Sequence, residues 1–155
     1  MTSNESQPVE NLSTDTCWEL MRSTVVGRLA VVIEGHPDIF PLNFVVDQGT
    51  VVFRTAAGAK MAGALANTPV ALEVDGYDAA TEQAWSVVLR GRAESIRQPQ
   101  ALADAGSLPL FPWQQGSKEH FVRIYPINLT GRRFKVATPD IWAAPASDAR
   151  RASFE

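Results

Sequence analysis

The stretch AWSVVLRGRAESI, residues 84–96, alternates apolar and polar side chains over most of its length. Successive residues of a strand point to opposite faces of a sheet, so this period of two predicts a long β-strand with one face on a core. The second face is charged and is expected to meet something polar. The apolar face carries Trp85, Val87, Leu89, Gly91 and Ala93, and the polar face carries Ser86, Val88, Arg90, Arg92 and Glu94.

Shorter strand patterns flank this stretch on both sides and are rich in β-branched and aromatic residues. Turn residues, such as those at 34–38 and 47–49, separate neighbouring patterns, which is typical of an antiparallel meander. Closure removes exposed strand edges, so the predicted fold class is mainly β, a small closed barrel of six or seven strands with short helices. The flanking strands are predicted at 25–33, 39–46, 50–55, 70–74, 120–125 and 128–136, with a polar loop at 75–83.

Three short helices are predicted beside these strands, at 14–23, 56–66 and 99–106. The first contains Thr16 and Glu19 at the spacing of a capping box, in which each side chain satisfies a backbone N–H at the start of the helix. The second is rich in alanine, the residue with the highest helix propensity. The pattern therefore indicates few helices beside many strands.

The chain has 155 residues, the size of one compact domain. Residues 1–12 are polar and lack a hydrophobic period, so they are expected to form a disordered tail. The barrel domain is expected to span residues 13–136. Residues 137–155 are rich in Ala, Pro and Asp and are expected to form a C-terminal tail.

Charge and cysteine content exclude several classes of protein. The formal net charge is −3, and residues 25–136 hold eleven bases against ten acids, so the sequence predicts neither nucleic acid nor a membrane as a partner. Cys17 is the only cysteine, which excludes an intramolecular disulfide and a multi-cysteine metal site. No signal-peptide pattern and no apolar run of about 20 residues is present. A soluble cytoplasmic protein is expected.

One cluster of candidate site residues follows the predicted strand 50–55. Arg54 and Thr55 end that strand, Gly58 opens the next helix, and Lys60 lies in its first turn. A helix N-terminus with an Arg, a hydroxyl and a Lys beside it is suited to a phosphate monoester. The alternative is a solvated strand end with an exposed lysine.

A second cluster lies on the long strand. Ser86, Arg90 and Arg92 share its polar face, and Trp85 precedes them. This face either contacts a ligand or is simply exposed, with its arginines paired to Glu94 or to Glu73 of a neighbouring strand. Trp85 is expected in the core more readily than stacked on a ring.

Four motifs occur in order along the chain: GRLA at 27–30, PLNF at 41–44, VFRT at 52–55 with Lys60 after it, and WSVVLRGR at 85–92. Together they resemble the pyridoxamine 5′-phosphate oxidase-like, FMN-binding split-barrel superfamily, and the resemblance covers about residues 16–134. The resemblance implies a six-stranded antiparallel split β-barrel that forms a homodimer, with one flavin site at each end of the interface.

The resemblance also implies a role for each motif. Arg54, Thr55 and Lys60 would hold the FMN phosphate, which carries about −1.5 to −2 charges at pH 7. The backbone around Pro41, Leu42, Asn43 and Phe44 would lie along the isoalloxazine ring. The cofactor would be reached from the partner subunit by Trp85, Ser86 and Arg90.

One departure from the family concerns the substrate. True pyridoxamine phosphate oxidases end with an Arg-x-His type motif, but here residues 130–134 read TGRRF, which argues against vitamin B6 oxidation. Some relatives bind the deazaflavin F420 and others bind haem. A haem would need an axial ligand, for which His36, His120 and Cys17 are the candidates, although a solvated histidine is the simpler interpretation of both histidines.

The sequence shows no hydrolytic triad and no acid–base pair of carboxylates, so catalytic residues stay unassigned and no metal site is expected. The first hypothesis is an FMN-dependent oxidoreductase that passes hydride or electrons to a small acceptor. The alternatives are a non-catalytic flavin-, F420- or haem-binding carrier or sensor, and a barrel that has lost its cofactor. Loops at 75–84 and 106–118 are expected to form the substrate pocket, with Phe111, Pro112 and Trp113 either lining it or packing.

Overall fold

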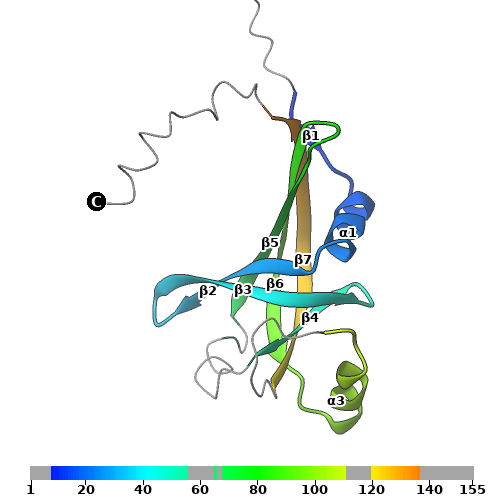
Figure 1. Ribbon diagram of the computed structural model, residues 1–155. Coiled ribbons are helices and arrows are strands. Elements are labelled where there is room, and N and C mark those ends of the chain that lie inside the picture. Colours follow the sequence, from blue (N-terminus) through cyan, green and yellow to red (C-terminus); the bar gives the residue numbers. More distant parts are fainter. Residues whose placement is uncertain (1–7, 56–64, 66–67, 111–119, 137–155) are drawn as a thin grey trace, which may run out of the picture.

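Figure 1 shows the architecture in a computed structural model, which describes residues 8–55, 65, 68–110 and 120–136. The elements within these ranges are seven strands and two helices. In chain order they are β1 (Glu10–Asn11), α1 (Thr14–Arg22), β2 (Val26–Ile33), β3 (His36–Asp47), β4 (Thr50–Thr55), β5 (Pro69–Asp78), β6 (Gln83–Ser95), α3 (Pro99–Gly106) and β7 (His120–Lys135).

Six strands form a closed antiparallel ring. Their order is β7–β4–β3–β2–β5–β6, and the pairing of β6 with β7 closes the ring. The short strand β1 pairs with the far end of β7. In Figure 1, β5, β6 and β7 run lengthwise and the β2–β3 hairpin crosses them. The mainly-β, six-stranded antiparallel barrel expected from the sequence is confirmed.

The strand β3 changes partner along its length. Residues 36–43 pair with β2 and residues 44–47 pair with β4, so a corner of the ring lies between Asn43 and Phe44. Over residues 36–43, no described strand pairs with the other edge of β3. Pro41 lies in this segment. Because no described strand pairs with that edge, the missing N–H of Pro41 costs no hydrogen bond there.

Two hairpins of the ring close on two-residue turns. Glu34 and Gly35 join β2 to β3 with φ angles of 51° and 80°, and Gln48 and Gly49 join β3 to β4 with 49° and 71°. Positive φ at both positions gives the turn a twist that matches the twist of the strands it joins. The turn predicted at 34–38 is therefore too long, because the strand resumes directly after Gly35.

The hairpin of β5 and β6 is longer than the sequence predicted. Residues 75–78 pair with residues 83–86, so only 79–82 lie outside the ladder. The predicted loop at 75–83 is wrong because residues 75–78 lack the apolar alternation of a half-buried strand. Backbone pairing with β6 replaces that missing signal.

The final strand is continuous, whereas the sequence predicted two strands at 120–125 and 128–136. The ladder of β6 and β7 shifts its register between Arg90 and Gly91, where β7 carries one extra residue, Ile127, and forms a bulge. A Cβ atom on Gly91 would collide with the carbonyl oxygen of Tyr125, so glycine allows this close approach. The chain therefore passes Pro126 without ending the strand.

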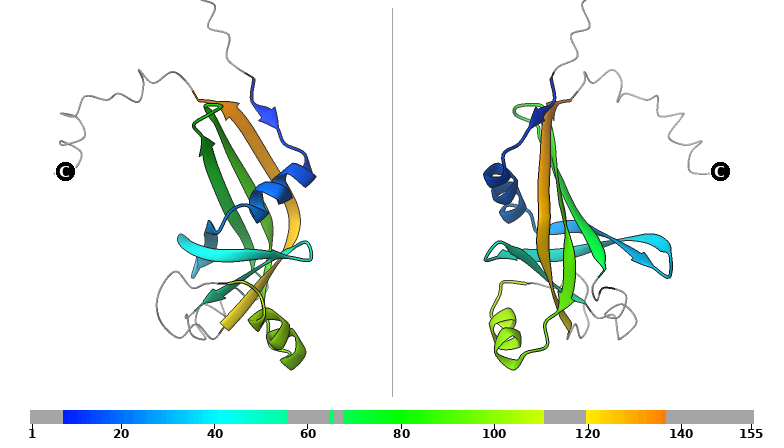
Figure 2. Two further views of the ribbon diagram at one scale, coloured as in Figure 1. Left: turned by 45° about the vertical axis from the view of Figure 1, so that its right-hand side comes forward. Right: turned by 180° about the vertical axis from the view of Figure 1, so that it is seen from behind.

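The helices cover the ends of the ring. Ser13 caps α1, because its Oγ accepts a hydrogen bond from the Thr16 N–H at 3.2 Å, so the predicted capping box at Thr16 is wrong. The inner side of α1 buries Cys17 and Met21, and burial raises the pKa of the Cys17 thiol. Figure 2 shows α1 beside β7 and α3 at the opposite end of the molecule. The predicted helix at 56–66 lies outside the described residues except for Leu65, which is helical and buried.

The core fills the inside of the ring. Inward-pointing side chains from every long strand are buried, and those of β5 and β6 follow the alternation predicted for residues 84–96. No helix in the described ranges is long and apolar enough to cross a membrane. The central members of the core are Leu29, Val31, Phe44, Val51, Phe53, Leu72, Val74, Val87, Leu89, Val122 and Ile124.

Candidate functional site

The outward-pointing side chains of β3, β2, β5, β6 and β7 form a surface that we call the outer face. Directly paired residues of neighbouring strands point to the same side of a sheet. The register therefore aligns one row across five strands of the outer face. This row consists of Pro41, Arg28, Glu73, Val88 and Thr130, and a neighbouring row consists of Ile39, Ala30, Ala71, Arg90 and Asn128.

The sequence-predicted cofactor residues divide between the two sides of the ring. Pro41 and Arg90 lie in the two rows of the outer face, and the alternation of their strands places Asn43 and Ser86 on the same side. Phe44 points inward and is 4% exposed. Leu42 and Trp85 also point inward and pack against the core. The inward residues can offer only their backbone to a ligand on the outer face.

The sequence left two roles open for Trp85, and the structure places its ring against the core of its own protomer. The indole lies over Gly76, its partner in the β5–β6 ladder. A Cβ atom on Gly76 would stand 2.5 Å from Cζ2 of Trp85, so the ring occupies the space that a side chain would need. A contact between Trp85 and a cofactor stays a prediction.

Arg54 and Thr55 end β4 at the corner where β3 leaves β4. Arg54 is one residue beyond the Phe44–Phe53 pair, and its guanidinium carbon lies 4.9 Å from the centroid of the Phe121 ring. This cation–π contact orients the guanidinium group. Lys60 and Gly58, the other members of the predicted phosphate cluster, lie outside the described residues.

A histidine joins this corner in a way that the sequence did not indicate. His120 opens β7 directly opposite Thr55 in the β4–β7 ladder, next to the Arg54–Phe121 pair. The two predictions that sequence analysis made separately, for a phosphate cluster and for a lone histidine, therefore concern neighbouring residues. His36 is distant from them in the fold, at the start of β3 and exposed.

An ion-pair cluster that the sequence missed lies on the outer face between Pro41 and Ser86. Nη1 of Arg28 stands 3.0 Å from Oε2 of Glu73 and 3.0 Å from Oδ2 of Asp75. Burial raises the pKa of Glu73, and the hydrogen bond from Arg28 partly opposes that change. Alternation around residue 74 is the signal that could have placed both carboxylates on one face.

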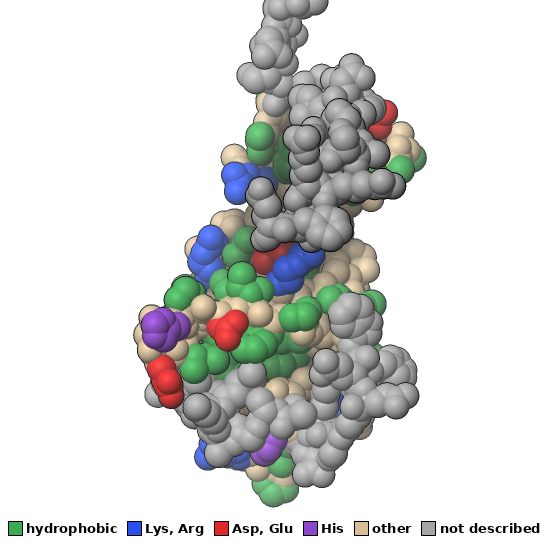
Figure 3. All heavy atoms as spheres, turned by 60° about the vertical axis from the view of Figure 1, so that its left-hand side comes forward, with side chains coloured by type: hydrophobic (Ala, Val, Ile, Leu, Met, Phe, Trp, Pro, Cys, Tyr) green, Lys and Arg blue, Asp and Glu red, His purple; other side chains and the backbone are tan. Residues whose placement is uncertain are grey.

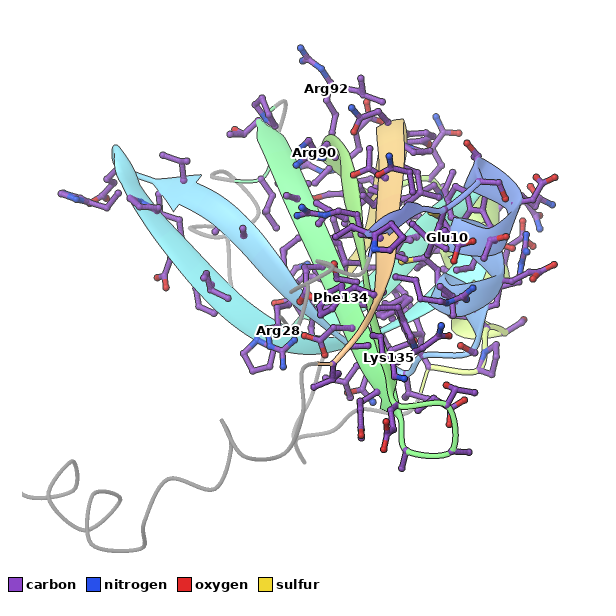
Figure 4. All side chains as sticks on the ribbon, turned by 90° about the horizontal axis from the view of Figure 1, so that it is seen from above. Glu10, Arg28, Arg90, Arg92, Phe134 and Lys135 are labelled. Atoms are coloured by element: carbon purple, nitrogen blue, oxygen red, sulfur yellow. The ribbon has the colours of Figure 1, made fainter. Side chains whose placement is uncertain are left out.

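The partner of Glu73 is Arg28, so the predicted pairing of Glu73 with Arg90 or Arg92 is wrong. Nη1 of Arg90 instead donates a hydrogen bond to Oγ1 of Thr130 at 3.3 Å. Figure 4 shows that the side chains of Arg28, Arg90 and Arg92 project from the ribbon, as expected for the outer face.

A pocket of about 470 Å³ opens on the outer face, within the size range of small-molecule sites. Figure 3 shows hydrophobic side chains gathered on the side of the molecule that carries the β2–β3 hairpin. Strand residues form the pocket, and none of the predicted loop at 75–84 lines it; residues 111–118, with Phe111, Pro112 and Trp113, lie outside the described ranges. The lining consists of Ala30, Val31, Val32, Pro37, Pro69, Val70, Ala71, Arg90, Gly91, Ile127 and Asn128.

Asn43, at the β3–β4 corner, has a buried side-chain oxygen. Its Oδ1 is buried with no hydrogen bond of its own, while the residue has another interaction. In the described ranges, no three His, Cys, Asp or Glu side chains gather in a way that could hold a metal ion. The chemistry offered here is thus that of Arg54 at the corner, Arg90 in the apolar pocket, and the ion-pair cluster of Arg28 elsewhere on the outer face.

A closed ring of six antiparallel strands with this arrangement of motifs defines a split β-barrel. The family model described as pyridoxamine 5′-phosphate oxidase matches residues 13–133. This match spans well over half of the chain, and the protein belongs to that family.

Solved structures agree with this assignment. The FAD binding protein from Mycobacterium smegmatis is 42% identical, with a TM-score of 0.70 over 81% of this chain and 98% of its own. A Corynebacterium glutamicum protein with the provisional name pyridoxamine 5′-phosphate oxidase is 39% identical, with a TM-score of 0.77 over 83% of this chain and 100% of its own. An FAD-binding protein from Mesorhizobium loti is 25% identical, with a TM-score of 0.65 over 82% and 99%.

Proposed function

We propose that this protein binds a flavin at the β3–β4 corner and is an oxidoreductase that passes hydride or electrons to a small acceptor. The observation that carries the proposal is the position of Arg54, held against Phe121 one residue beyond the point where β3 leaves β4. The similarity to FAD-binding proteins from two organisms supports it.

The residues at this corner fit a flavin phosphate. A phosphate monoester carries about −1.5 to −2 charges at pH 7, and an arginine fork binds its oxygens by charge-assisted hydrogen bonds. Thr55 adds a hydroxyl at the end of the same strand, and Lys60 adds a second cation a few residues later. In FAD the same phosphate is part of a diphosphate and not a monoester, but it is still an anion that an arginine can bind, so the expectation of FMN widens to either flavin, and the FAD-binding neighbours favour FAD.

The edge of β3 fits the flavin ring. Over residues 36–43, described strands pair with only one edge of β3, so backbone groups on its other edge can hydrogen-bond the ring. The N–H of Phe44 donates to the carbonyl of Val25, so the alternation of the ladder turns the backbone groups of Pro41 and Asn43 to the free edge, where they can meet the ring. A bound flavin supplies the electron transfer, and the chain supplies binding and orientation.

A second copy of the chain fits the outer face. Val32, Ile39 and Ile127 point outward and are 49%, 65% and 68% exposed. Exposed apolar patches of this kind mark interaction sites, and a homodimer would bury them. In such a dimer, Ser86 and Arg90 of one copy would approach the flavin of the other.

An absorbance spectrum of the purified protein, followed by titration with FMN and FAD, tests the cofactor. We expect flavin bands and saturable binding. Replacing Arg54 with Ala should weaken flavin binding by about tenfold or more, because a hydrogen bond to a charged group is lost. Arg22→Ala, at the exposed end of α1, is the matched control and should bind as the wild type does. A colourless protein that takes up neither flavin contradicts the proposal.

Turnover is tested separately by adding reduced nicotinamide or reduced F420 to the flavin-loaded protein together with an artificial electron acceptor. We expect reduction of the acceptor that depends on the flavin. Flavin binding without any such reduction would contradict the oxidoreductase and support a carrier or sensor. Haem added to the protein in a parallel titration should produce no Soret shift.

A further inference from the structure

The outer-face pocket is lined by residues from five strands, β2, β3, β5, β6 and β7. Ala30 and Val32 of β2 and Pro37 of β3 form one side, and Pro69 and Ala71 of β5 form the adjoining side. Ile127 of β7, the extra residue of the bulge opposite Gly91, also lines the pocket. The result is an apolar cavity built from strands, which hold their positions more rigidly than loops do.

Only two of the lining residues carry polar side chains, and they are neighbours. Arg90 and Asn128 pair directly in the β6–β7 ladder and lie together in the lining. The hydrogen bond of Arg90 to Thr130 ties the guanidinium to β7. The lining contains no Asp or Glu, so the pocket carries one positive charge within apolar walls.

We propose that this pocket binds an apolar small molecule that carries one anionic group, with Arg90 as its anchor. Apolar walls favour a ligand with a hydrocarbon or aromatic body. A ligand without charge would leave the guanidinium partly desolvated and uncompensated, whereas a carboxylate or phosphate would pair with it. Asn128 can donate a second hydrogen bond to the same group.

The pocket is distinct from the flavin corner. No residue of β4 lines it, and neither Arg54 nor Thr55 contributes to it. The row of Pro41, Arg28 and Glu73 lies between the pocket row and the row of Asn43. Within one copy the pocket is thus separate from the flavin corner. Because the proposed dimer would bring Arg90 of one copy toward the flavin of the other, the inference rests in that respect on the proposed function, and probe binding is therefore measured both with and without a flavin.

Isothermal titration with 2-naphthoate and 2-naphthamide tests the inference, since these probes share one apolar body and differ in charge. We expect naphthoate to bind about tenfold more tightly or better, the effect of one charged hydrogen bond. Equal affinities for the two probes, or no binding of either, would overturn the proposal.

Two variants locate the binding site. Arg90→Gln should reduce naphthoate binding to the level of naphthamide, while Arg92→Gln, two residues away on the same face and outside the lining, should change nothing. Ala71→Leu should fill the cavity and abolish the binding of both probes. An unchanged melting temperature shows that each variant is folded. Tight naphthoate binding by Arg90→Gln or Ala71→Leu would show that the probe binds elsewhere and overturn the proposal.

The ligand chemistry could come from a free molecule or from the adenylate half of an FAD molecule. Titration of naphthoate into protein saturated with FMN and into protein saturated with FAD separates these sources. Unchanged naphthoate affinity in the presence of FMN supports a pocket separate from the flavin ring. Loss of naphthoate affinity with FAD alone would show that the adenylate half of FAD is the anionic ligand of the pocket. Loss of affinity with FMN would overturn the proposal. A protein that binds naphthoate but no flavin would refute the flavin proposal alone.

Discussion

The inner and outer faces of the same strands differ sharply. On β5 and β6, Leu72, Val74, Val87 and Leu89 point inward and are fully buried. The outward residues between them include Glu73 and charged or small side chains that contact solvent. The inner face needs only apolar bulk, whereas the outer face combines exposed apolar groups, arginines and an ion-pair cluster. This difference indicates that the inner face makes the fold and the outer face serves partners and ligands.

The largest predicted effect comes from truncating one residue on each face. Leu72→Ala should lower the free energy of unfolding by about 2–5 kcal/mol, because it leaves a cavity in the core. Ile39→Ala, on the exposed outer face of β3, should change it by no more than about 0.5 kcal/mol in the monomer. Urea unfolding at low protein concentration measures both values. Similar losses from the two truncations would remove the distinction between the faces.

Gly76, which lies beneath the ring of Trp85, provides a second test of the difference between the two faces. Gly76→Val should lower the free energy of unfolding by about 1–3 kcal/mol, because the new side chain overlaps the indole ring. Displacement of Trp85 toward solvent should also change the tryptophan emission spectrum. Tyr77→Val, an exposed neighbour on the outer face, is the matched control. A stable variant with unchanged emission would show that Trp85 does not depend on Gly76.

The inner face was predictable from sequence because burial imposes a period of two on the residues. Residues 84–96 showed that period clearly, and β6 spans Gln83–Ser95. The start of α3 at Pro99 was predictable because proline favours the first turn of a helix. Physical constraints of this kind act on single residues and their near neighbours, so a sequence displays them directly.

Long-range pairing was not predictable to the same degree. Residues 75–78 form part of β5 only because β6 pairs with them, and β7 continues past Pro126 only because Gly91 admits a bulge. In the same way, Arg28 meets Glu73 through the ladder of β2 and β5. Such contacts depend on the register between strands that are distant in the sequence. The local sequence of one strand does not specify that register.

The candidate site was predictable in part. Pro41, Arg54 and Arg90 lie on the outer side of the ring, and the cofactor contacts that the motifs implied for them stay predictions. The pocket was not anticipated, because its walls combine residues from five strands. The inward direction of Trp85 followed from alternation, but the motif gave it a role on the opposite side.

The smallest predicted effect concerns Glu73 of the outer face and its dependence on pH. Burial raises the pKa of Glu73 above its usual value of 4.5, so the native state binds a proton more tightly than the unfolded state does. Stability from this group is therefore complete below pH 4.5 and declines as pH rises through the native pKa.

Glu73→Gln should abolish this decline, with a change within about 1 kcal/mol, as for ion pairs in contact with solvent. Arg28→Gln should make the decline steeper, because the hydrogen bond from Arg28 lowers the pKa of Glu73 and opposes the effect of burial. Urea unfolding of the three proteins across this pH range measures the slopes. A wild-type slope that survives in Glu73→Gln would assign it to another group. A wild-type stability that instead rises with pH over this range, and loses that rise in Arg28→Gln, would mean that the ion pair, and not burial, controls the carboxyl group on the outer face.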